Sequence, residues 1–99
     1  MGYDLIFHTH VEADVSEAYN WYEDREVGLG ERFLTELTIS YKKLQDYPEL
    51  FSKASKYYRK LIINYFPYLI AYEIDQNRVT VYAVFHTSQN PKEILKRKK

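Results

Sequence analysis

Three β-rich runs in the second half of the chain are joined by connections too short for anything but tight reversals. The runs are residues 56–65 (KYYRKLIINY), 68–75 (YLIAYEID) and 78–86 (RVTVYAVFH). Only Phe66-Pro67 separates the first two, and a polar turn around Gln76 separates the last two. Because links this short reverse the chain direction, the pattern predicts a three-stranded antiparallel meander.

The last of these runs is apolar on both faces for most of its length, which is typical of a central strand. Alternation with period two predicts one face made of Val79, Val81, Ala83 and Phe85, and an opposite face made of Thr80, Tyr82, Val84 and His86. One face then has to pack on helices. The other needs a cover, either the C-terminal tail or a partner chain.

The first half of the chain predicts a short strand over residues 3–8 and then two helices. Their apolar stripes are Val11, Val15, Ala18 and Tyr22 in the first helix, and Phe33, Leu37, Tyr41 and Leu44 in the second. Gly28 and Gly30 mark the link between them, and Pro48 ends the second helix. A link this short predicts an antiparallel helical hairpin.

The order of elements is therefore β-α-α-β-β-β. It predicts an α+β fold with the helical hairpin on one face of an antiparallel sheet. At 99 residues the chain is expected to form one domain, residues 1–99, with a short basic tail over residues 90–99.

Charge is distributed unevenly although the formal net charge is +0. Asp and Glu dominate the first half and Lys and Arg dominate the second, which predicts one acidic and one basic surface. The absence of cysteine, of a long apolar run and of a signal-like N-terminus leads to the expectation of a cytoplasmic protein that contacts no membrane. No ligand set for a metal and no cofactor motif is expected, because His8 and His10 have no evident third partner.

His86 is the candidate that most resembles a functional residue, because an apolar strand ends on it. Arg59, near the start of the first β-rich run, is the candidate cation. In a simple meander the two lie at opposite ends of the sheet. Only a long twist, an offset register or a bridging ligand would join them in one site.

Five segments, taken in order, resemble the RelE/ParE superfamily of toxins from bacterial type II toxin–antitoxin systems. They are EADVSEAYNWYE, GLGERFLTEL, YPELF, YRKLIINYFPYLIAYEI and VYAVFHTSQNP, and together they span nearly the whole chain. The resemblance implies a microbial-ribonuclease-like fold with a helical hairpin on an antiparallel sheet. It also implies a cognate antitoxin as a partner. The assembly expected from it is a toxin dimer or a toxin–antitoxin hetero-oligomer.

The resemblance leaves two main functions open, besides a degenerate member that retains only antitoxin binding. A ParE-like growth inhibitor would bind a target such as DNA gyrase, which is the preferred hypothesis. A RelE-like toxin would instead be an mRNA endonuclease acting on the ribosome, with His86 and Arg59 as catalytic residues. Members of the superfamily often carry arginine at the position of Gln89, and some active nucleases carry tyrosine at the position of Thr87, so enzymatic activity stays open.

The resemblance and the pattern of aromatic residues also suggest binding residues. Candidates for binding the target or a phosphate are Lys56, Tyr57 and Gln89. Candidates for binding the antitoxin are Trp21, Tyr22, Ile39, Tyr72 and Tyr82.

Overall fold

The computed structural model describes residues 2–97, so Lys98 and Lys99, the end of the basic tail, lie outside the described residues. Its elements in chain order are β1 (Asp4–Phe7), α1 (Val11–Arg25), α2 (Leu29–Asp46), the 3-10 turn η1 (Pro48–Leu50), β2 (Arg59–Ile62), β3 (Tyr68–Asp75), β4 (Arg78–His86) and α3 (Lys92–Arg97). The predicted order is confirmed, with a third, short helix added in the tail.

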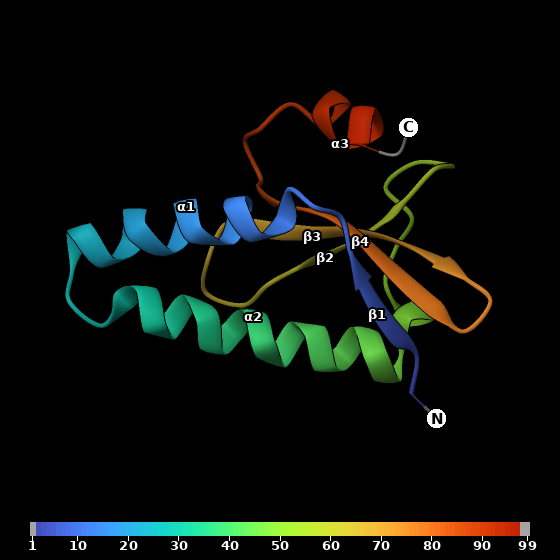
Figure 1. Cartoon of the computed structure of the whole chain (residues 1–99), viewed down its shortest axis with the longest axis horizontal. Helices are drawn as coiled ribbons and strands as arrows, with labels where there is room; N and C mark the ends of the chain where they lie inside the picture. The colour runs from blue at the N-terminus through green and yellow to red at the C-terminus, as the bar shows by residue number, and fades with distance from the viewer. Residues whose placement is uncertain (1, 98–99) are drawn as a thin grey trace.

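The four strands form one sheet in the order β1-β4-β3-β2 (Figure 1). β4 lies between two neighbours, which confirms the central position predicted for it. The sheet differs from the prediction in one pairing: β1 runs parallel to β4, while β2–β3 and β3–β4 are antiparallel. In the sequence, the two antiparallel helices come between β1 and the meander, so they supply the crossover that a parallel pairing requires.

β2 is shorter than the run of ten residues that predicted it. The chain before it folds back on itself, with the N–H groups of Ala54 and Ser55 both donating to the carbonyl of Tyr58. After it, Tyr65 has a φ of 70°, a turn conformation rather than a strand one. Both ends of the run are therefore used by turns.

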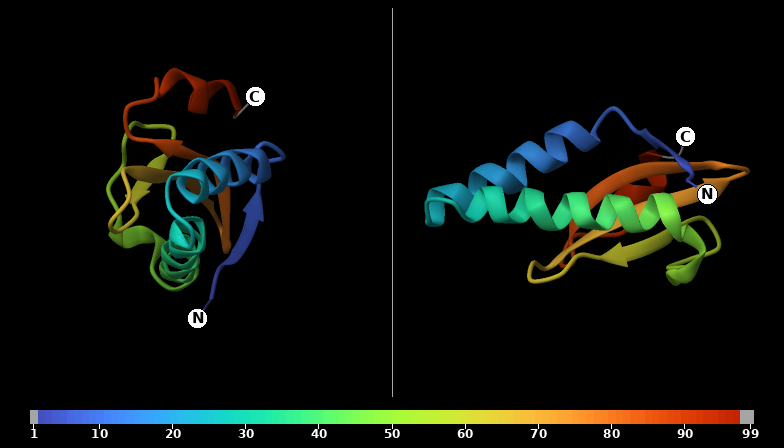
Figure 2. Two further views of the ribbon diagram at one scale, coloured as in Figure 1. Left: turned by 90° about the vertical axis from the view of Figure 1, so that its left-hand side faces the viewer. Right: turned by 90° about the horizontal axis from the view of Figure 1, so that it is seen from below.

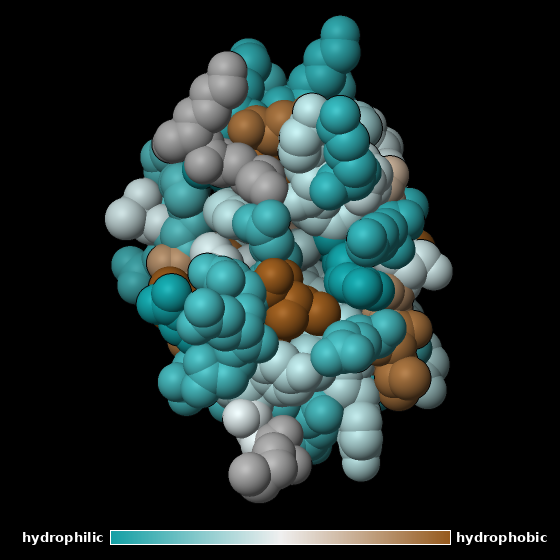
Figure 3. Space-filling view, turned by 90° about the vertical axis from the view of Figure 1, so that its right-hand side faces the viewer, coloured by the Kyte–Doolittle hydropathy of each residue, from teal (hydrophilic) through white to brown (hydrophobic). Residues whose placement is uncertain are grey.

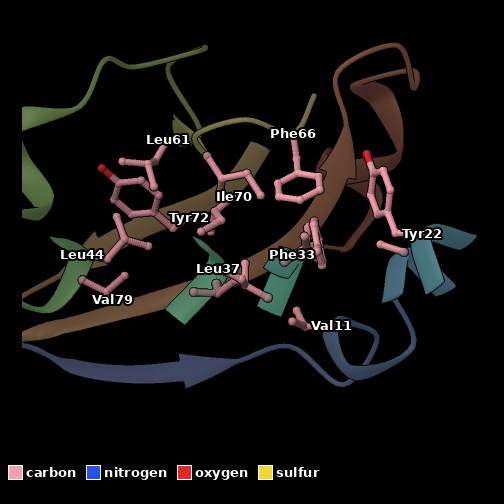
Figure 4. Packing of buried hydrophobic residues seen from close by; sticks show 14 residues of the cluster. Val11, Tyr22, Phe33, Leu37, Leu44, Leu61, Phe66, Ile70, Tyr72 and Val79 are labelled. Atoms are coloured by element: carbon pink, nitrogen blue, oxygen red, sulfur yellow. The ribbon is translucent and has the colours of Figure 1, made fainter. Parts of the chain in front are cut away.

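The helical hairpin and α3 cover opposite faces of the sheet (Figure 2). The larger core lies under the hairpin and is centred on Phe33, with Tyr22 and Phe66 among its neighbours (Figure 4). The Phe33 ring packs against the rings of Tyr22, Phe66 and Tyr68 with ring centres 5.2–5.5 Å apart. Aromatic pairs at this separation add to the stabilisation that burial gives. On the other face Ile94 of α3 packs over Ala71, Ala83 and Phe85. The C-terminal tail thus supplies the cover that the sequence required.

A glutamate fixes the corner between α1 and α2. Gly28 has a φ of 91°, which favours glycine, and its N–H donates to Glu23 Oε2 at 2.9 Å. Gly30 lies inside α2, and its N–H donates to Glu23 Oε1 at 3.0 Å. A Cβ on Gly30 would come within 2.8 Å of the Tyr19 ring, so the second glycine allows the two helices to approach closely.

Candidate functional site

A β-bulge at Tyr82 decides on which face of the sheet His86 lies. Ala71 of β3 is opposite Ala83, but Tyr72 is opposite Val81, so β4 has one extra residue at Tyr82. Beyond the bulge the alternation is inverted, because two consecutive residues take the same face. The predicted faces therefore hold only up to Tyr82: Val84 joins the core under the hairpin, whereas Ala83 and Phe85 join the core under α3.

The bulge brings His86 to the face that carries α1. His86 is paired with Tyr68 of β3, and the two rings meet edge to face with centres 5.2 Å apart. Together with α1 they line an open groove of about 610 Å³, whose walls are Glu17, Trp21, Tyr22, Pro67, Tyr68, His86, Ser88 and Gln89. The sequence prediction named four of these eight residues, namely Trp21, Tyr22, His86 and Gln89.

Local hydrogen bonds select one tautomer of the neutral His86 side chain. Its Nδ1 accepts the backbone N–H of Ser88 at 3.1 Å and lies 2.7 Å from the Ser88 hydroxyl oxygen. A nitrogen that accepts a backbone N–H has no proton of its own, so neutral His86 carries its proton on Nε2. Gln89 acts on the same turn, because its Oε1 accepts the backbone N–H of His86 at 2.7 Å.

The groove has a negative electrostatic potential. Glu17 is the one formally charged residue among its eight lining residues. Burial raises the pKa of Tyr68, and the nearby carboxylates of Glu17 and Asp14 raise it further. Burial likewise raises the pKa of Tyr22. The hydroxyls at the base of the groove therefore remain protonated at neutral pH.

Trp21 forms the outer wall of the groove. Its side chain is half-exposed, and its ring meets the Tyr22 ring edge to face at 5.1 Å. The guanidinium carbon of Arg25, one helical turn further along α1, lies 3.5 Å from the centre of the indole ring. This distance is that of a close cation–π contact.

Arg59 is not part of this groove. It is paired with Tyr72 on β3, whereas His86 is paired with Tyr68, four residues earlier on the same strand. This offset is roughly 13 Å along the strand and about 10 Å across the sheet. The guanidinium of Arg59 donates to the carbonyl oxygens of Phe51 at 2.8 Å and Glu49 at 3.4 Å. It fastens the segment after η1 to the sheet.

Two other predicted binding residues lie near Arg59 rather than near His86. Lys56 and Tyr57 line a small hollow of about 210 Å³ with Arg59, and the Lys56 ammonium lies 5.1 Å from the Tyr57 ring centre. Figure 3 shows the end of the molecule opposite to the link between α1 and α2 as a mainly hydrophilic surface with small hydrophobic patches. The structure thus separates the predicted set into two groups.

The residues predicted to bind an antitoxin differ in their exposure. Trp21 and Ile39 are exposed, Tyr82 is half-buried, and Tyr22 is buried but lines the groove. The prediction that Tyr72 contacts the antitoxin has to be corrected, because its side chain is fully buried. Its hydroxyl donates to the carbonyl of Pro48 at 2.5 Å. Its ring fills the core under the hairpin, so a partner cannot reach it in the folded protein.

Sequence reasoning missed Glu17 and Tyr68 as groove residues. Glu17 lies one turn before Trp21 on α1, so the two share a face of the helix, a signal that helical spacing carries. Tyr68 was not singled out because the bulge that brings His86 beside it leaves no clear mark in the sequence. Among residues 2–97 no three His, Asp or Glu side chains gather as metal ligands would. Nor is any helix in that range long and apolar enough to span a membrane.

Comparisons with known proteins agree with this architecture. Residues 5–91 match the model of the ParE toxin of type II toxin-antitoxin system, parDE. The chain is 30% identical over 91 residues to Toxin ParE2 of two strains of Mycobacterium tuberculosis, CDC 1551 / Oshkosh and H37Rv, covering 88% of this chain and 84% of each relative. A solved structure described as the chromosomal ParDE TA system from P. aeruginosa superposes with a TM-score of 0.74 at 12% identity, covering 85% of this chain and 95% of that one.

Proposed function

Because this chain belongs to the ParE toxin family of type II toxin–antitoxin systems, we propose that it arrests growth by binding a protein target such as DNA gyrase. We further propose that a cognate antitoxin neutralises it. The observation that carries the first proposal is the composition of the groove at His86: aromatic walls, one carboxylate and no lysine or arginine among the lining residues that the structure describes. Such walls suit contact with a protein better than they suit a phosphate chain.

Cleavage of RNA would need a different arrangement. A base must take the proton of the 2′-hydroxyl, and cations must stabilise the charge that develops on the phosphate. The Nδ1 of His86 is occupied by Ser88, and Nε2 carries the proton in the neutral ring, so neither nitrogen is free to act as the base. The cation predicted to assist, Arg59, is bound to backbone carbonyls elsewhere on the sheet. These observations favour the inhibitor over the endonuclease.

Two assays on the purified protein test the proposed target. In the first, supercoiling of plasmid DNA by DNA gyrase is measured at increasing toxin concentration, and we expect supercoiling to be inhibited. In the second, primer extension maps an mRNA that is being translated in the presence of the toxin, and we expect the mRNA to remain intact. Cuts in phase with the codons that vanish in His86→Ala would overturn the proposal in favour of the endonuclease.

The antitoxin part of the proposal is supported by exposed apolar side chains away from the His86 groove. Ile6 and Phe7 of the edge strand β1 and Ile39 of α2 are each more than 40% exposed. A second groove of about 580 Å³ runs between β1 and the helical hairpin, with Phe7, Val15 and Leu34 among its lining residues. A partner that covers such surfaces gains from removing apolar area from water.

Co-purification tests this part. A small protein encoded next to the toxin gene should copurify with the wild-type chain and restore growth when coexpressed. We expect Ile39→Lys to weaken the complex, because a charge would be buried in it. Lys42→Ala, on an exposed face of the same helix, is the matched control. Failure of every neighbouring gene product to bind or to restore growth would contradict the proposal.

A further inference from the structure

The groove at His86 holds a carboxylate that no other side chain among residues 2–97 neutralises. The Glu17 carboxylate makes neither an ion pair nor a hydrogen bond with the residues that the structure describes. The other acid that acts on Tyr68, Asp14, is paired with Arg97. Glu17 is therefore the charged side chain among the described residues that line the groove. Arg25, which lies against the Trp21 ring without lining the groove, is the cation that a bound positive charge would meet beside it.

The walls around Glu17 are aromatic. Trp21 stands one helical turn from Glu17 on the same face of α1, and Tyr22 and Tyr68 lie at the base of the groove. The faces of aromatic rings attract cations, and tryptophan is the most effective of them. The chain already provides an example, since the Arg25 guanidinium lies against the Trp21 ring.

We propose that this groove binds an arginine side chain of a protein partner, with the guanidinium held between the aromatic walls and paired to Glu17. A planar guanidinium stacks on a ring and donates two parallel N–H bonds to a carboxylate, which an ammonium group cannot do. The Nε2–H of His86 is a donor on the same wall, suited to a backbone carbonyl of the segment that carries the arginine. The inference rests on the proposed function only in that the partner is a protein.

The single tryptophan of the chain makes the groove directly observable. The probes are three capped peptides that differ at one position: acetyl-Gly-Arg-Gly-amide, the same peptide with citrulline, which has nearly the shape of arginine without its charge, and the same peptide with lysine. Each is titrated into the purified toxin at constant ionic strength while Trp21 fluorescence is recorded. We expect the arginine peptide to bind about tenfold more tightly than the citrulline peptide. The lysine peptide should bind with intermediate affinity.

Two variants locate the effect. Glu17→Gln should abolish the preference for arginine over citrulline. Glu12→Gln also removes one exposed carboxylate from the same helix. Because Glu12 lines the other groove, this variant should leave the preference unchanged. Both positions are exposed, and a thermal melt followed by circular dichroism checks that each variant is folded.

Three results would overturn the inference: equal binding of the arginine and citrulline peptides, a preference that survives in Glu17→Gln, or equal loss in Glu12→Gln. Equal binding of lysine and arginine would overturn the assignment of a guanidinium. None of these readouts involves gyrase. A toxin that inhibits supercoiling without an arginine preference would contradict this inference alone, and the reverse result would contradict only the proposed target.

Discussion

Arg97 of α3 and Asp14 of α1 form a two-pronged ion pair that joins the C-terminal helix to the helical hairpin. Nη1 lies 2.6 Å from Oδ2 and Nη2 lies 3.0 Å from Oδ1, and both side chains are less than 20% exposed. Asp14 Oδ2 also accepts the backbone N–H of Val84 at 3.0 Å. β1 pairs with β4 only as far as Val81, so this carboxylate satisfies a strand N–H that no neighbouring strand reaches.

Removing this ion pair should destabilise the fold, and the two partners should differ. Asp14→Ala removes the acceptor of the Val84 N–H and leaves the part-buried Arg97 guanidinium with the carbonyl of Tyr82, 3.1 Å from Nη1, as its remaining acceptor. We expect a loss of about 3 kcal/mol in the free energy of unfolding. Arg97→Ala leaves the carboxylate with the Val84 N–H, and we expect a loss of about 2 kcal/mol. Urea unfolding followed by circular dichroism measures both.

The control for this prediction is Lys96→Ala. The ion pair between Lys96 and Glu93 lies on the same short helix but has both side chains more than half exposed, so its loss should cost less than about 0.5 kcal/mol. If Lys96→Ala lowered the free energy of unfolding as much as Arg97→Ala does, shortening any side chain of α3 would have the same effect on stability. The specific role of the Asp14–Arg97 pair would then be refuted.

Stability should fall at alkaline pH because of two tyrosines, the buried Tyr72 and the half-buried Tyr82. Burial raises the pKa of Tyr72 to about 12, and burial together with the hydrogen bond to Glu73 raises the pKa of Tyr82 to about 12. The unfolded chain releases these protons near pH 10 and the native state retains them, so the stabilisation is complete below about pH 10 and is lost as the pH rises to about 12. Urea midpoints measured at several pH values between 8 and 12 should decline across that interval.

The variant Tyr72→Phe tests the origin of this decline. At neutral pH it should cost about 1–2 kcal/mol, because the buried Pro48 carbonyl loses its donor. Between pH 10 and 12 it should lose less stability than the wild-type protein, since one titrating group is absent. An identical alkaline decline in both proteins would show that Tyr72 does not contribute to it.

Periodicity predicted the elements of this fold well because each stripe or alternation reports which side of an element is buried. β3 and β4 begin and end at the predicted residues, 68–75 and 78–86. The faces of β4 could not be predicted to its end. The bulge at Tyr82 adds one residue to one strand, and that depends on how two strands fit together rather than on the composition of either.

The same limit applies to the site. His86 could be selected from the sequence because it ends an apolar strand, but its neighbours depend on the face to which the bulge turns it. Without the bulge His86 would lie with Tyr82 on the α3 face, away from Glu17 and Trp21. Tyr72 was misjudged for a related reason: an aromatic residue on a strand is equally compatible with an interface and with a core, and only the packed hairpin decides between them.

The protonation form of His86 can be observed directly. The hydrogen bond from the Ser88 N–H to Nδ1 predicts that neutral His86 is protonated on Nε2. Long-range ¹H–¹⁵N correlation spectra at alkaline pH distinguish the two nitrogens by their ¹⁵N shifts. Ser88→Ala removes the hydroxyl but keeps the backbone donor, so the same tautomer should be observed. A proton found on Nδ1 in either protein would contradict the proposed geometry of the turn.

Growth arrest should survive the loss of the imidazole. If the toxin acts by binding, His86→Gln removes one donor at the groove but no group that transfers a proton, and arrest measured as colony counts after induction should change by less than about tenfold. Trp21→Ala removes a half-exposed wall of the same groove and, with it, the ring against which a bound segment would pack. It should weaken arrest more than His86→Gln does, because large aromatic side chains dominate the binding energy of protein interfaces. Complete loss of arrest in His86→Gln, with Trp21→Ala still toxic and both proteins folded, would instead indicate that the imidazole carries out chemistry.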